Sequence, residues 1–127
     1  MSVRIFWICL GGAAGTAGRY LLTGWLSRAL GTDFPYGTLA VNVLGGVAAG
    51  AVAGWLLSRS TGGADSTSLF LMTGLLGGFT TFSAFSLDAV LLWQRGQAAA
   101  AIGYVAASVL LAIGGVIAGM SAVRAFA

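Results

Sequence analysis

The segment GLLGGFTTFSAFS, residues 74–86, places a glycine pair and a threonine pair in the middle of a long apolar stretch. Glycine and threonine are both poor helix formers, so we predict that a helix breaks near Gly77 to Thr81. Inside a membrane, non-helical backbone survives only where protein, water or an ion satisfies its polar groups. Such a break exposes carbonyl oxygens and N–H groups, which membrane proteins use to bind ions. The alternative is a kink whose hydroxyls bond back to the chain.

The composition is that of a membrane protein. The 127 residues are 58% hydrophobic and 7% charged, against roughly 25% charged residues in a soluble domain. A soluble chain of this size could not bury so much apolar surface. Four apolar stretches are each close to the ~20 residues that a helix needs to cross a bilayer. They run roughly from Ile5 to Leu26, from Tyr36 to Leu57, from Ser68 to Trp93 and from Ala98 to Val123.

Three short connections join these stretches. They are residues 27–34, residues 58–67 and a tight turn at 94–97, and Pro35 suits the start of the second helix. The connections leave no room for a soluble domain, so we expect residues 1–127 to form a single transmembrane domain. The apolar run at the N-terminus shows no cleavage site, and we expect it to remain as a span. The predicted fold is an all-α, multi-pass protein of the cell (inner) membrane whose third helix is broken in mid-membrane.

The basic residues are divided evenly between the two ends of the predicted helices. All six are arginines spread singly along the chain, so no basic patch is available for nucleic acid. Three fall on the side of the N-terminus and three on or near the other side: Arg4, Arg59 and Arg124 against Arg19, Arg28 and Arg95. An excess of basic residues on one side orients a membrane protein, and this chain has none. We predict dual topology with antiparallel pairing; the alternative is that one arginine or a folding partner decides the orientation.

Glycine, at 21 of 127 residues, recurs every four positions in three of the predicted helices. The repeats are Gly46, Gly50 and Gly54, then Gly11 with Gly15, and Gly115 with Gly119. Small residues at this spacing let helices approach closely in lipid, so we predict tight packing within the bundle. Four thin helices enclose a pathway poorly, which favours an oligomer.

A few polar side chains fall inside the predicted spans, where such groups mark functional sites. Asn42 offers two donors and an acceptor, either for an interhelical hydrogen bond or for a bound anion. Phe82 and Phe85 share a helix face and can aim their positive ring edges at one small anion. Arg19 either reaches the headgroups or makes an electropositive vestibule. Tyr104 and Ser108, four residues apart, add a short polar line.

The residues that catalysis and proton-coupled export require are missing. The chain has no histidine, lysine or glutamate, and Cys9 is its only cysteine. No nucleophile therefore has a base beside it, and no set of side chains can bind a transition metal, so we predict that the protein is not an enzyme. Small multidrug-type exporters need a central carboxylate, and Asp88, in the final third of its span, is the only candidate.

Three motifs together resemble the CrcB/Fluc family of fluoride channels, and the resemblance covers essentially the whole chain. The first span has glycines followed by Arg19 and Tyr20, the second has GTLAVN ending at Asn42, and the third has GGFTTFSAF at residues 77–85. The third motif is the most specific. One departure is Ala84, where the family usually has threonine, and it removes a hydroxyl from the polar route.

The resemblance implies an antiparallel homodimer in the lipid bilayer, with two pores along the subunit interface that export fluoride passively from the cytoplasm. The residues that it places on the fluoride route are Asn42, Phe82, Phe85, Thr81, Ser83, Tyr104 and Ser108. It implies no cofactor besides a structural sodium ion on the two-fold axis, held by the backbone carbonyls of Gly77 and Thr80 from both subunits. The competing interpretations are a small multidrug-type exporter and a membrane subunit that only assembles with partners.

Overall fold

The computed structural model describes residues 2–59 and 65–126, and every regular element in these ranges is a helix. In chain order the elements are α1 (Ser2–Leu30), α2 (Tyr36–Ser58), α3 (Ser66–Ser68), the π-helical segment η1 (Leu69–Leu76), α4 (Gly77–Phe79), α5 (Phe82–Gln94) and α6 (Ala98–Phe126). The segments α3, η1, α4 and α5 follow one another as one rod, called the third rod below. The described chain thus has four rods that are long and apolar enough to cross a membrane, and the four predicted spans are confirmed.

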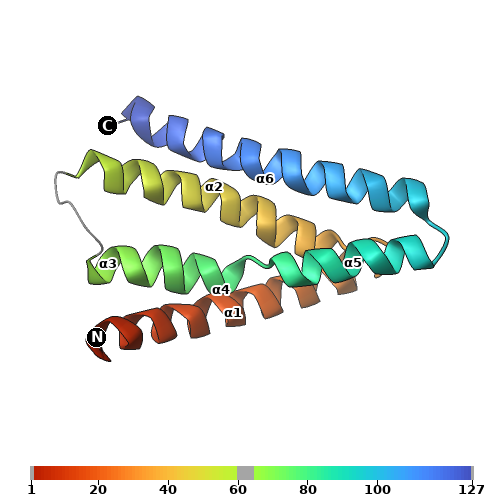
Figure 1. Ribbon diagram of the computed structural model, residues 1–127, viewed down its shortest axis with the longest axis horizontal. Helices are drawn as coiled ribbons and strands as arrows, with labels where there is room; N and C mark the ends of the chain where they lie inside the picture. The colour runs from red at the N-terminus through yellow and green to blue at the C-terminus, as the bar shows by residue number, and fades with distance from the viewer. Residues whose placement is uncertain (1, 60–64, 127) are drawn as a thin grey trace.

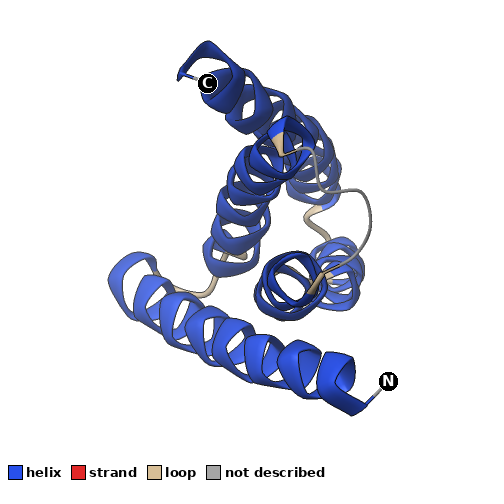
Figure 2. Ribbon diagram, turned by 90° about the vertical axis from the view of Figure 1, so that its left-hand side faces the viewer, coloured by secondary structure: helices blue, strands red, loops and turns tan. Residues whose placement is uncertain are grey.

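The rods pack in two pairs. Figure 1 shows α2 lying along α6, and α1 lying along the first half of the third rod. Both termini and the end of α2 are at one end of the molecule, and the α1–α2 and α5–α6 connections are at the other. The arginines near these ends are therefore divided between the two sides as the sequence predicted. Seen from the end with the termini, α1 and α6 tilt in different directions (Figure 2).

The chain buries few large side chains by itself. The described apolar residues that are buried are Val41, Leu76, Phe85, Leu92, Ala101 and Tyr104. Large apolar side chains such as Leu21, Leu57, Val90 and Leu110 are exposed on every rod. A monomeric soluble protein rarely exposes so large an apolar surface, and the four apolar rods assign this surface to contact with lipid or with another membrane-embedded chain.

Glycine permits the close contact between α2 and α6. A Cβ atom on Gly50 would collide with the carbonyl oxygen of Val116, and one on Gly119 would collide with the carbonyl oxygen of Val47. The two helices therefore pack backbone to backbone, as the glycine spacing predicted. The repeat in α1 acts in the same way against the third rod, where Gly15 lies against η1.

Two residues with extended backbone, Thr80 and Thr81, interrupt the third rod between α4 and α5 (Figure 1), and together they form the break. Thr80 has φ −89° and ψ 158°, and Thr81 has φ −152° and ψ 121°. The break is shorter than predicted, because Gly77–Phe79 is still helical. Space explains the glycine at position 78: a Cβ there would lie 2.6 Å from the carbonyl oxygen of Gly12 on α1. The glycine thus serves close packing, and the threonines form the interruption.

Single residues shape the connections. Gly31, with φ +86°, lets the chain leave α1, and Gly96, with φ +78°, makes the turn into α6. Pro35 precedes α2, as predicted. Asp65 caps α3 by accepting the backbone N–H of Ser68 at 2.8 Å, and this hydrogen bond holds the pKa of Asp65 below its ordinary value. The predicted connection at 58–67 lies partly outside the described residues, at 60–64.

We expect Gly119→Ala to destabilise the fold and Gly103→Ala to leave it as stable or make it more stable. Both substitutions in α6 gain about 1 kcal/mol of helix propensity, but only a methyl group at position 119 would meet the backbone of α2, since a Cβ atom on Gly103 would have no atom of another element within 4 Å. Overpacking costs about 1–3 kcal/mol. The measurement is the midpoint of thermal unfolding in mild detergent, followed by circular dichroism. Equal midpoints for the two variants would contradict backbone-to-backbone packing of α2 and α6.

Candidate functional site

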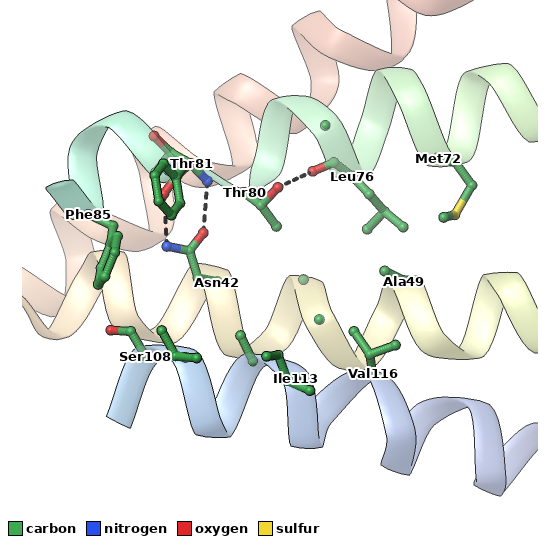
Figure 3. A pocket seen from close by; sticks show the side chains of 16 residues that line it. Asn42, Ala49, Met72, Leu76, Thr80, Thr81, Phe85, Ser108, Ile113 and Val116 are labelled. Atoms are coloured by element: carbon green, nitrogen blue, oxygen red, sulfur yellow. Dashed lines mark hydrogen bonds between the residues drawn. The ribbon is translucent and has the colours of Figure 1, made fainter. Parts of the chain in front are cut away.

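The side chain of Asn42 on α2 pairs with the backbone of the break. Its Nδ2–H donates to the carbonyl oxygen of Thr81 at 2.9 Å, and its Oδ1 accepts the Thr81 N–H at 2.8 Å (Figure 3). The amide thereby supplies the acceptor that the Thr81 N–H loses where the helix is interrupted, and it adds a second donor to the Thr81 carbonyl, which as the N-cap of α5 already accepts the first hydrogen bond of that helix. One Nδ2 hydrogen of Asn42 is left for another acceptor. Of the two roles predicted for Asn42, the interhelical hydrogen bond is present in the structure.

The hydrogen bonds around the break release two carbonyl groups. In a continuous helix the Gly77 carbonyl would accept the N–H of Thr81, but that N–H donates to Asn42. The Thr80 carbonyl would accept the N–H of Ala84, but that N–H donates to the Thr81 hydroxyl at 3.1 Å. The carbonyls of Gly77 and Thr80 have therefore lost their helical donors. Backbone carbonyls are hard oxygen ligands of the kind that sodium requires, so these two groups fit the predicted cation site.

The helix α5 begins directly after the break and presents its N-terminal end there. Thr81 is the N-cap, and its hydroxyl accepts the Ala84 N–H and also lies 3.4 Å from the Ser83 hydroxyl. The first N–H groups of a helix have no intrahelical acceptor, and the helix dipole makes this end positive. The geometry is favourable for an anion without any ionised side chain.

A cavity of about 610 Å³ lies beside the break, between α2, the third rod and α6 (Figure 3). Its lining is mostly apolar and contains no charged residue. The predicted site residues that line it are Asn42, Gly77, Thr80, Thr81, Phe82, Phe85 and Ser108. Ser83, Tyr104 and Arg19 are absent from the lining. The structure thus brings most of the predicted site together around one space.

Phe82 and Phe85 lie next to each other with very different exposure. Their ring centroids are 5.4 Å apart at an interplanar angle of 48°. Phe85 is 9% exposed, whereas Phe82 is 78% exposed. The shared face that the spacing predicted is present, and Phe82 presents most of its surface outside the single chain.

Tyr104 lies behind Phe85, with its ring centroid 5.4 Å from that of Phe85. It is fully buried, and its hydroxyl donates to Oδ2 of Asp88 at 3.3 Å. Ser108, one turn further along α6, is buried, and its hydroxyl has no hydrogen-bond partner among the described residues. Sequence reasoning left Asp88 out of the site, although it is the only carboxylate within a span. Its place among the polar residues depends on the packing of α5 against α6.

Arg19 reaches α4, just before the break, from the neighbouring helix α1. Its Nε–H donates to the carbonyl oxygen of Gly78 at 3.0 Å, and the side chain is half-buried. The two predicted roles, contact with headgroups or an electropositive vestibule, did not include this bond. Among the described residues no group of three or more His, Cys, Asp or Glu side chains is placed to hold a metal ion.

Comparison with known proteins gives a consistent result along the whole chain. The sequence profile described as "CrcB-like protein, Camphor Resistance (CrcB)" matches residues 6–120. A Rhizobium etli protein named "Fluoride-specific ion channel FluC" is 48% identical over 125 residues, covering 98% of this chain and 99% of that protein. Proteins of the same name from Cereibacter sphaeroides and Paracoccus denitrificans are 50% and 49% identical, each covering 92% of this chain and 91% of the relative.

We expect Asn42→Ala to loosen the break. The substitution leaves the Thr81 N–H without its acceptor, and an unsatisfied buried polar group costs about 1–3 kcal/mol, which corresponds to roughly a 5- to 150-fold larger population of the locally opened state. Hydrogen–deuterium exchange of the peptide that covers residues 77–85 measures this change. Ser83→Ala is the matched control, because it removes only the 3.4 Å contact with Thr81. Unchanged exchange in Asn42→Ala would show that the amide does not hold the break.

Proposed function

The chain belongs to the CrcB family, and on that basis we propose that it is a fluoride-selective ion channel that lets fluoride leave the cytoplasm passively. It is a multi-pass protein of the cell (inner) membrane, with the four spans described above. Its relatives are named as ion channels, not as enzymes.

The observation that carries this proposal is the junction of the break with an uncharged cavity. The N-cap of α5, Thr81, the first residue of that helix, Phe82, and Asn42, which keeps one uncommitted Nδ2 hydrogen, all line this cavity. Helix N–H groups, amide hydrogens and aromatic ring edges carry partial positive charge. Donors of this kind replace the water of a small anion, and a site without a fixed cation binds weakly enough for the anion to leave.

The chemistry of fluoride makes a passive channel sufficient. Hydrogen fluoride is a weak acid that crosses membranes in its neutral form and ionises in the less acidic cytoplasm, where the anion is trapped. A selective anion channel then lets the membrane potential expel the fluoride, at ~2.3 kcal/mol per charge per 100 mV. No ATP and no proton coupling are required.

We place the fluoride route along the residues that line or adjoin the cavity. Asn42, Phe82 and Phe85 contact fluoride in this proposal. The hydroxyls of Thr81, Ser83, Tyr104 and Ser108 extend the route, and the buried, unpartnered hydroxyl of Ser108 supports its inclusion. Ala84 supplies no hydroxyl, but the neighbouring Thr81 and Ser83 hydroxyls do.

The functional unit in this proposal is an antiparallel homodimer with two pores along its interface. Three features support this dimer. A single chain leaves the cavity beside the break open on one side, and Phe82 is 78% exposed in that chain. The arginines are balanced between the two ends of the helices. A second copy inserted in the opposite direction would cover Phe82 and complete the enclosure. Arg19 would add positive potential to the approach of each pore.

A structural sodium ion at the dimer axis completes the proposal. The carbonyls of Gly77 and Thr80, which the break deprives of helical donors, would hold it together with the same groups of the second copy. When bound, such an ion neutralises the partial negative charge of the carbonyls and links the two subunits. No carboxylate is needed.

A small multidrug-type exporter is less well supported. Its mechanism needs a carboxylate that faces the substrate, but Asp88 accepts a hydrogen bond from Tyr104 and does not line the cavity. The assembly-subunit interpretation predicts no ion flux from the purified protein, and the following experiment separates it from the channel.

We expect liposomes that contain the purified protein to lose fluoride rapidly and to retain chloride. Phe82→Ile should reduce the fluoride flux at least tenfold while leaving the dimer intact, because isoleucine removes the ring edge but keeps a large apolar side chain at the proposed interface. Phe85→Ile should also reduce the flux, with some loss of packing against Tyr104. A fluoride-selective electrode measures the efflux, and size-exclusion chromatography measures the dimer. No fluoride efflux from folded, dimeric protein would contradict the channel, and full flux in both variants would exclude the ring-edge contacts.

We expect one added arginine to bias the orientation of insertion. Ser2→Arg adds a charge at the end that holds both termini, and Gln97→Arg adds one at the opposite end, in the turn before α6. Each variant should insert mainly with its added arginine in the cytoplasm, and topology reporters at the C-terminus should give opposite signals. Each variant alone should lose most fluoride transport, and co-expression of the two should restore it. Reporter signals that stay mixed in both variants would argue against the balanced-charge explanation.

A further inference from the structure

Arg19 is the third member of a stripe on α1 that packs against the third rod. Gly11, Gly15 and Arg19 are spaced by four residues, so they lie on one face of the helix. The two glycines are buried against backbone atoms of η1 and α4, with no space for a side chain. These close contacts fix the position of α1 along the third rod, and the next residue of the stripe therefore reaches the break.

The hydrogen bond from Arg19 replaces a donor that the break removes. In a continuous helix the Gly78 carbonyl would accept the N–H of residue 82, but Thr80 and Thr81 are extended and take that residue out of helical register. The Nε–H of Arg19 donates to the Gly78 carbonyl at 3.0 Å, across 59 residues of sequence. Without it, this carbonyl would lack a partner in a medium that offers none.

Side chains from α1 and α2 thus supply hydrogen-bond donors to some of the carbonyls in and just before the break and not to others. The carbonyls of Gly78 and Thr81 each accept a side-chain hydrogen bond. The carbonyls of Gly77 and Thr80, each one residue earlier, have lost their helical donors. The φ and ψ angles of one residue relate the direction of its carbonyl to that of the carbonyl before it, so at the helical backbone of Gly78 and the extended backbone of Thr81 a carbonyl held by a side chain also orients the preceding one.

We propose that Arg19 is a positioning residue for a cation held by the carbonyls of Gly77 and Thr80. Its bond to Gly78 keeps the backbone of the break in the conformation that leaves these two carbonyls free and fixed in direction. The inference rests on the sodium site of the proposed function. It assigns Arg19 a role that a general electropositive vestibule does not require.

The positive charge of Arg19 and its hydrogen bond to Gly78 have opposite expected effects on sodium binding. The charge of Arg19 repels a nearby cation, so removing the charge alone would lower the sodium concentration needed for binding. Removing the hydrogen bond frees the Gly78 peptide and would raise that concentration. Lysine keeps the charge but lacks the Nε–H, and it therefore separates the two effects.

The experiment measures sodium-dependent thermal stabilisation of the purified full-length chain in detergent, with N-methylglucamine replacing sodium at constant ionic strength. We expect Arg19→Gln to raise the half-maximal sodium concentration at least tenfold and Arg19→Lys to raise it at least threefold. Arg28→Gln is the control, because it removes the same charge from the same helix and Arg28 makes no ion pair or side-chain hydrogen bond among the described residues. It should change the value less than twofold.

An unchanged or lower sodium concentration in both Arg19 variants would overturn the proposal, as would an equal rise in Arg28→Gln. If Arg19→Gln does not fold, Arg19→Lys decides alone, and no shift in that variant overturns the positioning role. An absence of sodium-dependent stabilisation in the unsubstituted chain would also overturn it. That result would leave the channel proposal standing, because fluoride efflux from liposomes tests the channel separately.

Discussion

The pairing of the Asn42 side chain with the backbone of Thr81 is the contact on which the rest of the site depends. A helix that is interrupted inside a membrane leaves polar backbone groups with no water to satisfy them. One primary amide can both donate and accept, and Asn42 uses both capacities on the same residue. A carboxylate or a hydroxyl at this position could not do so with the same geometry. Asn42 thus satisfies the Thr81 N–H, while Thr80 bonds back to the Leu76 carbonyl through both its N–H and its hydroxyl.

The glycine contacts bring the helices close enough for these hydrogen bonds to form. Asn42 and Arg19 can reach the third rod only if α1 and α2 run close to it, and a Cβ on Gly15 or Gly45 would collide with that rod. At Gly45 the colliding atom would be the methyl group of Thr80, in the break itself. The composition of the chain, rich in glycine and poor in charge, thus supports the site directly. Small residues bring the backbones together, and a few polar side chains satisfy the groups that the break exposes.

Those parts of the structure that depend on length and periodicity could be predicted from the sequence. The four spans, the division of arginines between the two ends and the glycine packing all follow from patterns within single helices. The break is predicted less accurately. Gly78 is a glycine because α1 packs closely against it, and it remains helical. The hydrogen-bond partners of Asn42, Arg19 and Asp88 could not be predicted, since each bond depends on how far two packed helices are shifted along each other. Helix propensity and residue spacing within one helix carry no information about that shift.

The break also gives a chain with few charged side chains partial charges of both signs at one place. The carbonyl ends of α4 point into it with partial negative charge, and the first N–H groups of α5 carry partial positive charge. Because only Thr80 and Thr81 separate the two helices, both ends lie at one level of the third rod. Uncapped carbonyls there suit a hard cation, and uncapped N–H groups suit a small anion. Charged side chains in the same place would bind one ion tightly and hold it, whereas backbone dipoles leave an anion free to move.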